Sequence, residues 1–232
     1  MTAPDGPARF ALYWAPDVDD PLHEAAATWL GRDPETGAAR PQPDLPDLPA
    51  ITADARRYGF HATLKAPFRL AAGTTYAALR TTAAALAART APFDLPPLAV
   101  GDLDGYMALR ETRPCPKLHA LADAAIAGLD AHRAPADRWE LDRRASARLT
   151  DAERAMLERW GYPAAFATWY FHMTLSRRLD ADEQARLRPA AEAHFAPALA
   201  RPRRVTAVAL FSEARPGAPF LIAERLPLLG RA

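Results

Sequence analysis

The chain has 232 residues, half of which are apolar, and its 29 lysines and arginines nearly balance its 28 aspartates and glutamates. A chain of this size supports a real hydrophobic core, in one large domain or in two small lobes. Its formal net charge of +1 gives no reason to expect a surface that coats nucleic acid.

The cysteine content and the N-terminal residues indicate in which cellular compartment the protein resides. Cys115 is the single cysteine, so no intramolecular disulfide can form, as is usual in a reducing environment. Residues 1–9 lack the apolar run of a secretory signal, and no segment approaches the ~20 apolar residues that span a bilayer. We therefore expect a cytoplasmic, soluble protein without membrane contact.

In the first half of the chain, hydrophobic periodicity, caps and turn residues predict strands interrupted by single helices. The predicted elements are a buried strand over 9–15, a helix over 21–30 closed by Gly31, a strand over 58–68, a helix from Gly73–Thr75 to about Arg89, and two strands between 93 and 110 that turn near 102–105.

The second half repeats the order strand, helix, strand pair after two further helices. The predicted elements are a helix over 117–132, a capping-box helix from Thr150 to Gly161, a strand over 169–175, a capping-box helix from Asp180 to near Phe195, and a hairpin of strands 204–211 and 220–226 around Pro216-Gly217. The order is therefore mixed, with several strands interrupted by single helices.

The segment 33–49 is rich in proline and cannot form regular structure. Loops this long inside a compact domain are often functional. Two interpretations stay open here: a disordered linker, or a lid over the site.

Two short strings in the chain are nearly identical. Residues 60–64 read Phe-His-Ala-Thr-Leu and residues 171–175 read Phe-His-Met-Thr-Leu, and each is followed by a predicted helix and hairpin. The strings lie about half the chain apart, which indicates an internal duplication. We expect residues 1–232 to form one bilobal domain, with His61 in one lobe and His172 in the other.

The repeated string can process a phosphoester. Residues i and i+2 of a strand share a face, so His61 accompanies Thr63, and His172 accompanies Thr174. A hydroxyl can donate to a non-bridging phosphate oxygen while an imidazole serves the attacking or leaving oxygen. Two such strands would give an acid and a base on opposite sides of phosphorus, as in-line displacement requires. A lone histidine on a strand is usually structural, but two matched copies favour a functional pair.

Charged neighbours of the motifs are candidates for neutralising phosphate. The alternation puts Lys65 on the face of His61 and Thr63, where it binds phosphate or serves as an ordinary surface residue. The second strand has Ser176 at the corresponding position, and Arg177 or Arg178 would supply the missing charge.

The aromatic and remaining imidazole side chains carry weaker signals. Tyr58 and Tyr170 would stack on a base or sugar or, more commonly, pack in the core, and Tyr13 is a weaker candidate. The other histidines fall on predicted helices, where we expect solvent exposure; they are His23, His119, His132 and His194. No carboxylate–histidine cluster indicates a metal site, and we expect no cofactor.

At these motifs the chain resembles the 2H phosphoesterase superfamily. The longer strings 58–68, 30–37 and 169–175 are similar to its phosphonate-metabolism branch, which is associated with carbon–phosphorus lyase operons. The resemblance implies a bilobal α+β fold with a central cleft and no essential metal. It also implies that His61 and His172 are the acid/base pair, that Thr63 and Thr174 bind phosphate oxygens, and that a cyclic phosphodiester is hydrolysed or opened.

The resemblance leaves the substrate open. A small cyclic ribose phosphate or nucleotide is the expected partner, and RNA ends bearing a 2′,3′-cyclic phosphate are a less favoured one. Two alternatives to hydrolysis remain: a module that binds a nucleotide or phosphosugar without turnover, and ligation at a 2′,5′ linkage, which is the reverse reaction. Intact motifs without a strongly basic stripe favour an enzyme over an RNA-binding module.

Overall fold

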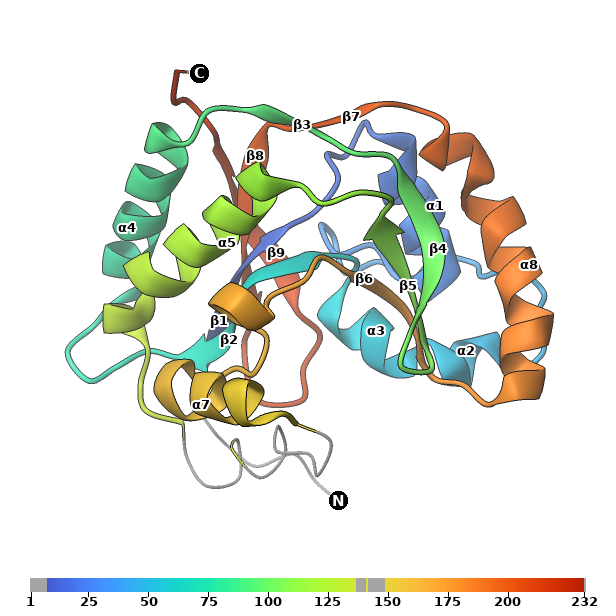
Figure 1. Ribbon diagram of the computed structural model, residues 1–232, viewed down its shortest axis with the longest axis horizontal. Coiled ribbons are helices and arrows are strands. Elements are labelled where there is room, and N and C mark those ends of the chain that lie inside the picture. Colours follow the sequence, from blue (N-terminus) through green and yellow to red (C-terminus); the bar gives the residue numbers. More distant parts are fainter. Residues whose placement is uncertain (1–7, 137–140, 142–148, 232) are drawn as a thin grey trace.

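A computed structural model describes residues 8–136, 141 and 149–231. It combines helices with antiparallel strands, which confirms the predicted α+β class (Figure 1). The helices are α1 (Pro21–Leu30), α2 (Leu48–Ile51), α3 (Ala53–Tyr58), α4 (Tyr76–Arg89), α5 (Pro116–Gly128), α7 (Asp151–Trp160) and α8 (Ala181–Leu199), with short 3-10 turns η1 (Asp130–His132) and η2 (Phe166–Thr168). The strands are β1 (Arg9–Trp14), β2 (Ala62–Arg69), β3 (Phe93–Leu95), β4 (Leu98–Leu103), β5 (Tyr106–Glu111), β6 (Met173–Arg178), β7 (Arg203–Val205), β8 (Ala207–Glu213) and β9 (Leu221–Pro227).

Helix ends follow the predicted capping residues. α1 begins after Asp20, whose carboxylate accepts from the Leu22 amide, and it ends at Gly31 in the left-handed conformation. Capping boxes open α7 at Thr150 and α8 at Asp180, as predicted. α8 continues beyond the predicted end near residue 195 to Leu199.

The two halves of the chain exchange their hairpins. Each half runs strand, helix, short strand, hairpin: β2, α4, β3, β4–β5 and then β6, α8, β7, β8–β9. The sheets are ordered β2-β1-β8-β9 and β4-β5-β6, so each hairpin joins the sheet that holds the other half's motif strand. The short strands β3 and β7 pair with each other. This order supports the predicted duplication, and each of the two sheets combines strands from both halves of the chain.

The first lobe is the four-stranded sheet with α4 and α5, and the second is the three-stranded sheet with α1 and α8 (Figure 1). One apolar core reaches both sheets and includes Trp29, Phe171 and Phe195, which are fully buried. Alternation along β1 turns Leu12 toward this core and Tyr13 toward a smaller apolar cluster with Phe211. Apolar side chains therefore pack on both faces of the four-stranded sheet at β1.

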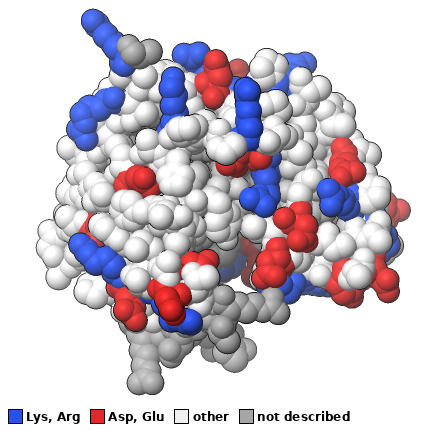
Figure 2. Space-filling model, viewed as in Figure 1, with Lys and Arg blue, Asp and Glu red and all other residues white. Residues whose placement is uncertain are grey.

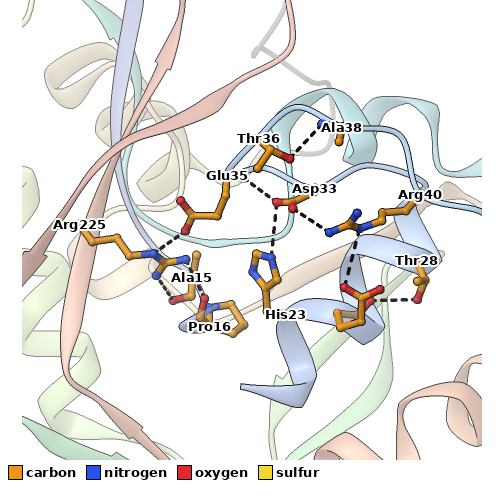
Figure 3. Close-up of polar contacts among 11 residues, drawn as sticks. Ala15, Pro16, His23, Thr28, Asp33, Glu35, Thr36, Ala38, Arg40 and Arg225 are labelled. Carbon is orange, nitrogen blue, oxygen red and sulfur yellow. Dashed lines mark hydrogen bonds and ion pairs between the residues drawn. The ribbon is translucent and has the colours of Figure 1, made fainter. Parts of the chain in front are cut away.

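The proline-rich segment is fastened to its surroundings (Figure 3). Asp33 receives a hydrogen bond from Arg40 at 3.1 Å and lies 3.4 Å from the ring of His23, while Glu35 accepts from Arg225 of β9 at 2.6 Å. These contacts decide against the disordered-linker interpretation of the segment and leave the lid interpretation open. They also correct the expected exposure of His23, which is buried because its partner Asp33 lies on that segment.

Acidic and basic side chains are interspersed over the face shown in Figure 2. This mixing agrees with the near-neutral composition. None of the helices in the described ranges has both the length and the apolar character that crossing a membrane requires.

Candidate active site

The two motif strands meet at one cavity of about 330 Å³. His61 and His172 each stand one residue before their strand begins, at Ala62 of β2 and Met173 of β6. Both histidines line the cavity together with Thr63 and Thr174. The structure thus brings together the four residues that the repeated string singled out, two from each lobe.

Each imidazole is held by the backbone carbonyl two residues before it. His61 Nδ1 lies 2.8 Å from the Gly59 oxygen, and His172 Nδ1 lies 3.3 Å from the Tyr170 oxygen. A carbonyl oxygen can only accept, so Nδ1 donates in both rings and Nε2 of the neutral ring carries the lone pair. His61 Nε2 lies 3.2 Å from the Thr63 hydroxyl oxygen. Both rings therefore have the tautomer that a general base needs.

The surroundings of both rings favour the neutral form. The Tyr13 ring stacks on His61 with 3.7 Å between centroids and 16° between planes, and Phe211 lies on the same side. Burial, with a further contribution from His172, lowers the pKa of His61 to about 4. Burial and the charge of Arg110 also lower the pKa of His172. The mutual effect means that protonation of one ring opposes protonation of the other.

Lys65 does not reach the cavity, which corrects the expectation that it shares the face of His61. The β1–β2 register pairs Tyr13 with Thr63 but Leu12 with Lys65, so β2 holds one extra residue at this point. Because paired residues share a face, Lys65 turns toward the core with Leu12. Its ammonium donates to the Ile126 carbonyl at 2.9 Å and to Asp130 at 2.8 Å.

The second motif strand has a register shift at the corresponding place. The buried Ser176 hydroxyl there accepts from the Met107 amide at 3.0 Å and so replaces a ladder hydrogen bond. Arg177 lines the cavity, where both its terminal nitrogens bind Glu183 at 2.9 and 2.7 Å. Arg178 does not line it and pairs with Asp104 instead.

Several lining residues lay outside the sequence prediction. Asp54 comes from α3, a short helix without a clear apolar periodicity, Tyr106 is the first residue of β5, and Tyr162 follows the end of α7. Tyr58 lines the cavity, whereas Tyr170 lines a separate groove with Trp169. An aromatic residue next to a turn is the only sequence signal that these tyrosines offer, and it is weak.

The charges around the cavity are few. Among its described lining residues, Arg177 is the single arginine or lysine and Asp54 the single carboxylate. No three histidine, cysteine, aspartate or glutamate side chains in the described ranges are grouped to hold a metal ion. The side chains that the two motifs bring to the cavity are imidazoles and hydroxyls.

Sequence comparison relates the chain to one family and to two longer proteins. A family model described as "Protein of unknown function (DUF1045)" matches residues 63–221. A ribose 1,5-bisphosphate phosphokinase PhnN of Janthinobacterium sp. (strain Marseille) is 40% identical over 232 residues, covering 96% of this chain and 51% of that protein. The protein of the same name from Laribacter hongkongensis (strain HLHK9) is 38% identical over 225 residues, covering 95% and 52%. The chain spans about half the length of these relatives.

Structure comparison finds more distant similarity. E. coli LigT complexed with 3′-AMP has 18% identity and a TM-score of 0.45, with 96% of this chain and 99% of that chain covered. A crystal structure of a phosphoesterase has 15% identity and a TM-score of 0.45 over the same shares.

Proposed function

The chain belongs to the DUF1045 family, and we propose that it opens a small cyclic phosphodiester by acid–base catalysis with two histidines and without a metal. The observation that carries the proposal is the convergence of two His-x-Thr motifs, one from each lobe, on one cavity. Each motif offers a ring with a lone pair on Nε2 and a hydroxyl on the same side of the strand. The motif resemblance to 2H phosphoesterases points to the same reaction.

We assign His61 as the base and His172 as the acid. The carbonyl of Gly59 holds His61 more closely than the carbonyl of Tyr170 holds His172, at 2.8 against 3.3 Å. Burial lowers the pKa of His61 to about 4, which keeps that ring neutral at neutral pH. An anionic phosphodiester in the cavity raises the pKa of both rings. Mutual repulsion allows one proton on the pair, and it resides on His172.

The proposed step balances protons within the pair. A water oxygen attacks phosphorus while His61 Nε2 takes a proton from that water. The bond from phosphorus to one ring oxygen breaks, and His172 gives its proton to that oxygen, which becomes a hydroxyl. Thr63 and Thr174 donate to the non-bridging oxygens, where negative charge builds up. The product is a phosphate monoester, and proton exchange with solvent restores the pair.

We infer a ribose phosphate as the substrate. A cavity of about 330 Å³ lies at the lower end of the range for small-molecule sites. The relatives that contain a region similar to this chain are named for a kinase of ribose 1,5-bisphosphate. Opening the 1,2-cyclic phosphate of ribose 5-phosphate at the oxygen of carbon 2 gives ribose 1,5-bisphosphate. The chain would then supply the substrate of such a kinase, and the motif resemblance adds phosphonate breakdown as the setting.

The test is turnover, in EDTA, of three compounds followed by phosphorus NMR. They are the 1,2-cyclic phosphate of ribose 5-phosphate, a nucleoside 2′,3′-cyclic phosphate, and a short RNA with a 2′,3′-cyclic end. We expect the first to be opened fastest, with a monoester at carbon 1. Binding without turnover would overturn the enzyme reading in favour of a binding module. Activity that disappears on chelation would contradict the metal-free mechanism, and joining of RNA ends would indicate a ligase.

A further inference from the structure

Arg32 is a buried arginine that lies just outside the proposed site. Its side chain donates to three backbone carbonyls: Arg56 at 2.9 Å, Arg57 at 3.2 Å and Phe220 at 2.9 Å. The first two belong to the last turn of α3, and each of them also accepts from a backbone amide: Arg56 from Gly59 at 3.2 Å and Arg57 from Phe220 at 2.8 Å. The third belongs to the residue before β9. One planar side chain thus fixes the end of α3 against the edge of the first lobe.

The burial of Arg32 is energetically unfavourable by itself. The residue is 7% exposed, and its Nη1 has no hydrogen-bond partner among the described residues. Burial lowers the pKa of Arg32 to about 10, which reflects the cost of removing the charge from water. Buried polar atoms without partners are rare in folded proteins and call for an explanation. The position of Arg32 relative to Gly59 supplies one.

Gly59 is the residue through which α3 reaches His61. It follows the last residue of α3 and has φ +78° and ψ 165°, a conformation that is almost confined to glycine. A Cβ at this position would lie 2.9 Å from Pro34 and 3.4 Å from Arg32 Nη2. In this conformation the Gly59 carbonyl accepts from His61 Nδ1. The orientation of that carbonyl therefore depends on where Arg32 holds the end of α3.

We propose that Arg32 is a positioning residue for His61, acting through the carbonyl of Gly59. The inference rests on the proposed function, since it assigns the residue that keeps the base in its Nε2 lone-pair tautomer. The second motif offers an internal comparison. Among the described hydrogen bonds, none joins an arginine to the carbonyl of Tyr170, which holds His172, and the bond from that carbonyl to the ring is longer, at 3.3 Å. The tighter hold belongs to the ring that we assign as the base.

The test compares Arg32→Lys with a matched control, Arg203→Lys. Lysine keeps the charge but lacks the planar fork that reaches three carbonyls. Arg203 is equally buried, at 8%, and also donates to the carbonyl of a helix end, Ala198 of α8, but it does not line the cavity. The readouts are the ¹⁵N NMR tautomer of His61, assigned through its loss in His61→Gln, and the separate values of kcat and KM.

We expect Arg32→Lys to give a mixture of His61 tautomers and to lower kcat by about 10- to 100-fold with little change in KM, as small displacements of catalytic groups do. Arg203→Lys should leave the His61 tautomer and kcat unchanged, even if its melting temperature falls as much as that of Arg32→Lys. An unchanged tautomer in Arg32→Lys overturns the inference, whatever happens to kcat.

A second variant covers the case in which Arg32→Lys does not fold. Gly59→Ala leaves Arg32 in place but forces the backbone out of its present conformation, so the same tautomer mixture is expected. Retention of the single tautomer in Gly59→Ala would refute the role of that carbonyl. The tautomer is observed without substrate, so a failure to find turnover would count against the proposed function and not against this inference.

Discussion

The indole nitrogen of Trp169 donates a hydrogen bond of 2.9 Å to the carbonyl oxygen of Thr63. Trp169 precedes His172 by three residues, and Thr63 is the threonine of the first motif. The bond therefore connects the segment before the second motif to the first motif, across the two lobes. Trp169 is 8% exposed, which protects the bond from competing water. The relative placement of the two histidines therefore depends in part on one side chain.

Removing this bond should impair catalysis more than folding. Trp169→Phe keeps an aromatic ring but loses the donor, and we expect a loss of about 1 kcal/mol in the free energy of unfolding. Turnover should fall by about tenfold or more, because acid and base must keep an in-line placement. Urea unfolding and kcat measure the two effects. Unchanged kcat at reduced stability would show that the bond is purely structural.

Much of the fold follows from local signals in the sequence. The end of α1 at Gly31 and the capping boxes at Thr150 and Asp180 are local signals, since each depends on residues within one turn. The duplication is visible because the two motif strings retain the same residues. Their convergence on one cavity follows from the relation between the halves rather than from any single stretch.

The sequence predictions that the structure corrects concern side chains and strand pairings that depend on residues far away in the chain. Strand alternation alone puts Lys65 beside Thr63, and only the pairing of β2 with β1 introduces the extra residue that turns Lys65 inward. His23 is buried because it pairs with Asp33, which lies on the proline-rich segment, and the position of that segment could not be predicted from its composition. The hairpin exchange between halves likewise has no local signal, because either sheet offers a suitable edge.

The two histidines should each be necessary for turnover. His61→Ala and His172→Ala remove the base and the acid, and each should lower kcat by about 10²- to 10⁴-fold. His119→Ala is a matched control, because His119 lies outside the cavity and binds the Phe166 carbonyl at 2.9 Å. Circular dichroism should show that all three variants fold. Full activity in either motif variant would refute the paired mechanism.

The two threonines should act on the transition state. Thr63→Val and Thr174→Val keep the shape of the side chain but remove the hydroxyl that we assign to the non-bridging oxygens. Loss of one such donor typically lowers kcat by ~10²-fold or more. We expect kcat to fall by more than KM rises. A rise in KM alone, with kcat retained, would assign the hydroxyls to ground-state binding instead.

Lys65 should matter for stability and not for phosphate binding. Burial lowers the pKa of Lys65 even though Asp130 counteracts the shift, and the Asp130 carboxylate also binds Arg133 at 2.8 Å. Lys65→Met breaks a buried pair and should cost about 3 kcal/mol of unfolding free energy, with KM unchanged. The double variant Lys65→Met/Asp130→Asn should recover part of that loss. A large rise in KM in Lys65→Met would restore the phosphate-binding role.

The pH dependence of kcat/KM should have its maximum on the acid side of neutrality. The base must be deprotonated, so activity rises with pH through the pKa of His61, which is about 4. The acid must be protonated, so activity falls as pH rises through the pKa of His172, which burial and Arg110 hold below its ordinary value of 6.5. For the free enzyme, the two limbs enclose a maximum between the pKa of His61 and the pKa of His172.

The profile of kcat itself should differ in a defined direction. Bound phosphodiester carries a negative charge that raises the pKa of His172, so the alkaline limb of kcat should lie at higher pH than that of kcat/KM. His172→Ala should remove the alkaline limb, whereas His61→Ala should remove the acidic one. Rates measured from pH 4 to 9 on one cyclic substrate test both statements. Loss of the alkaline limb in His61→Ala instead would exchange the roles of acid and base.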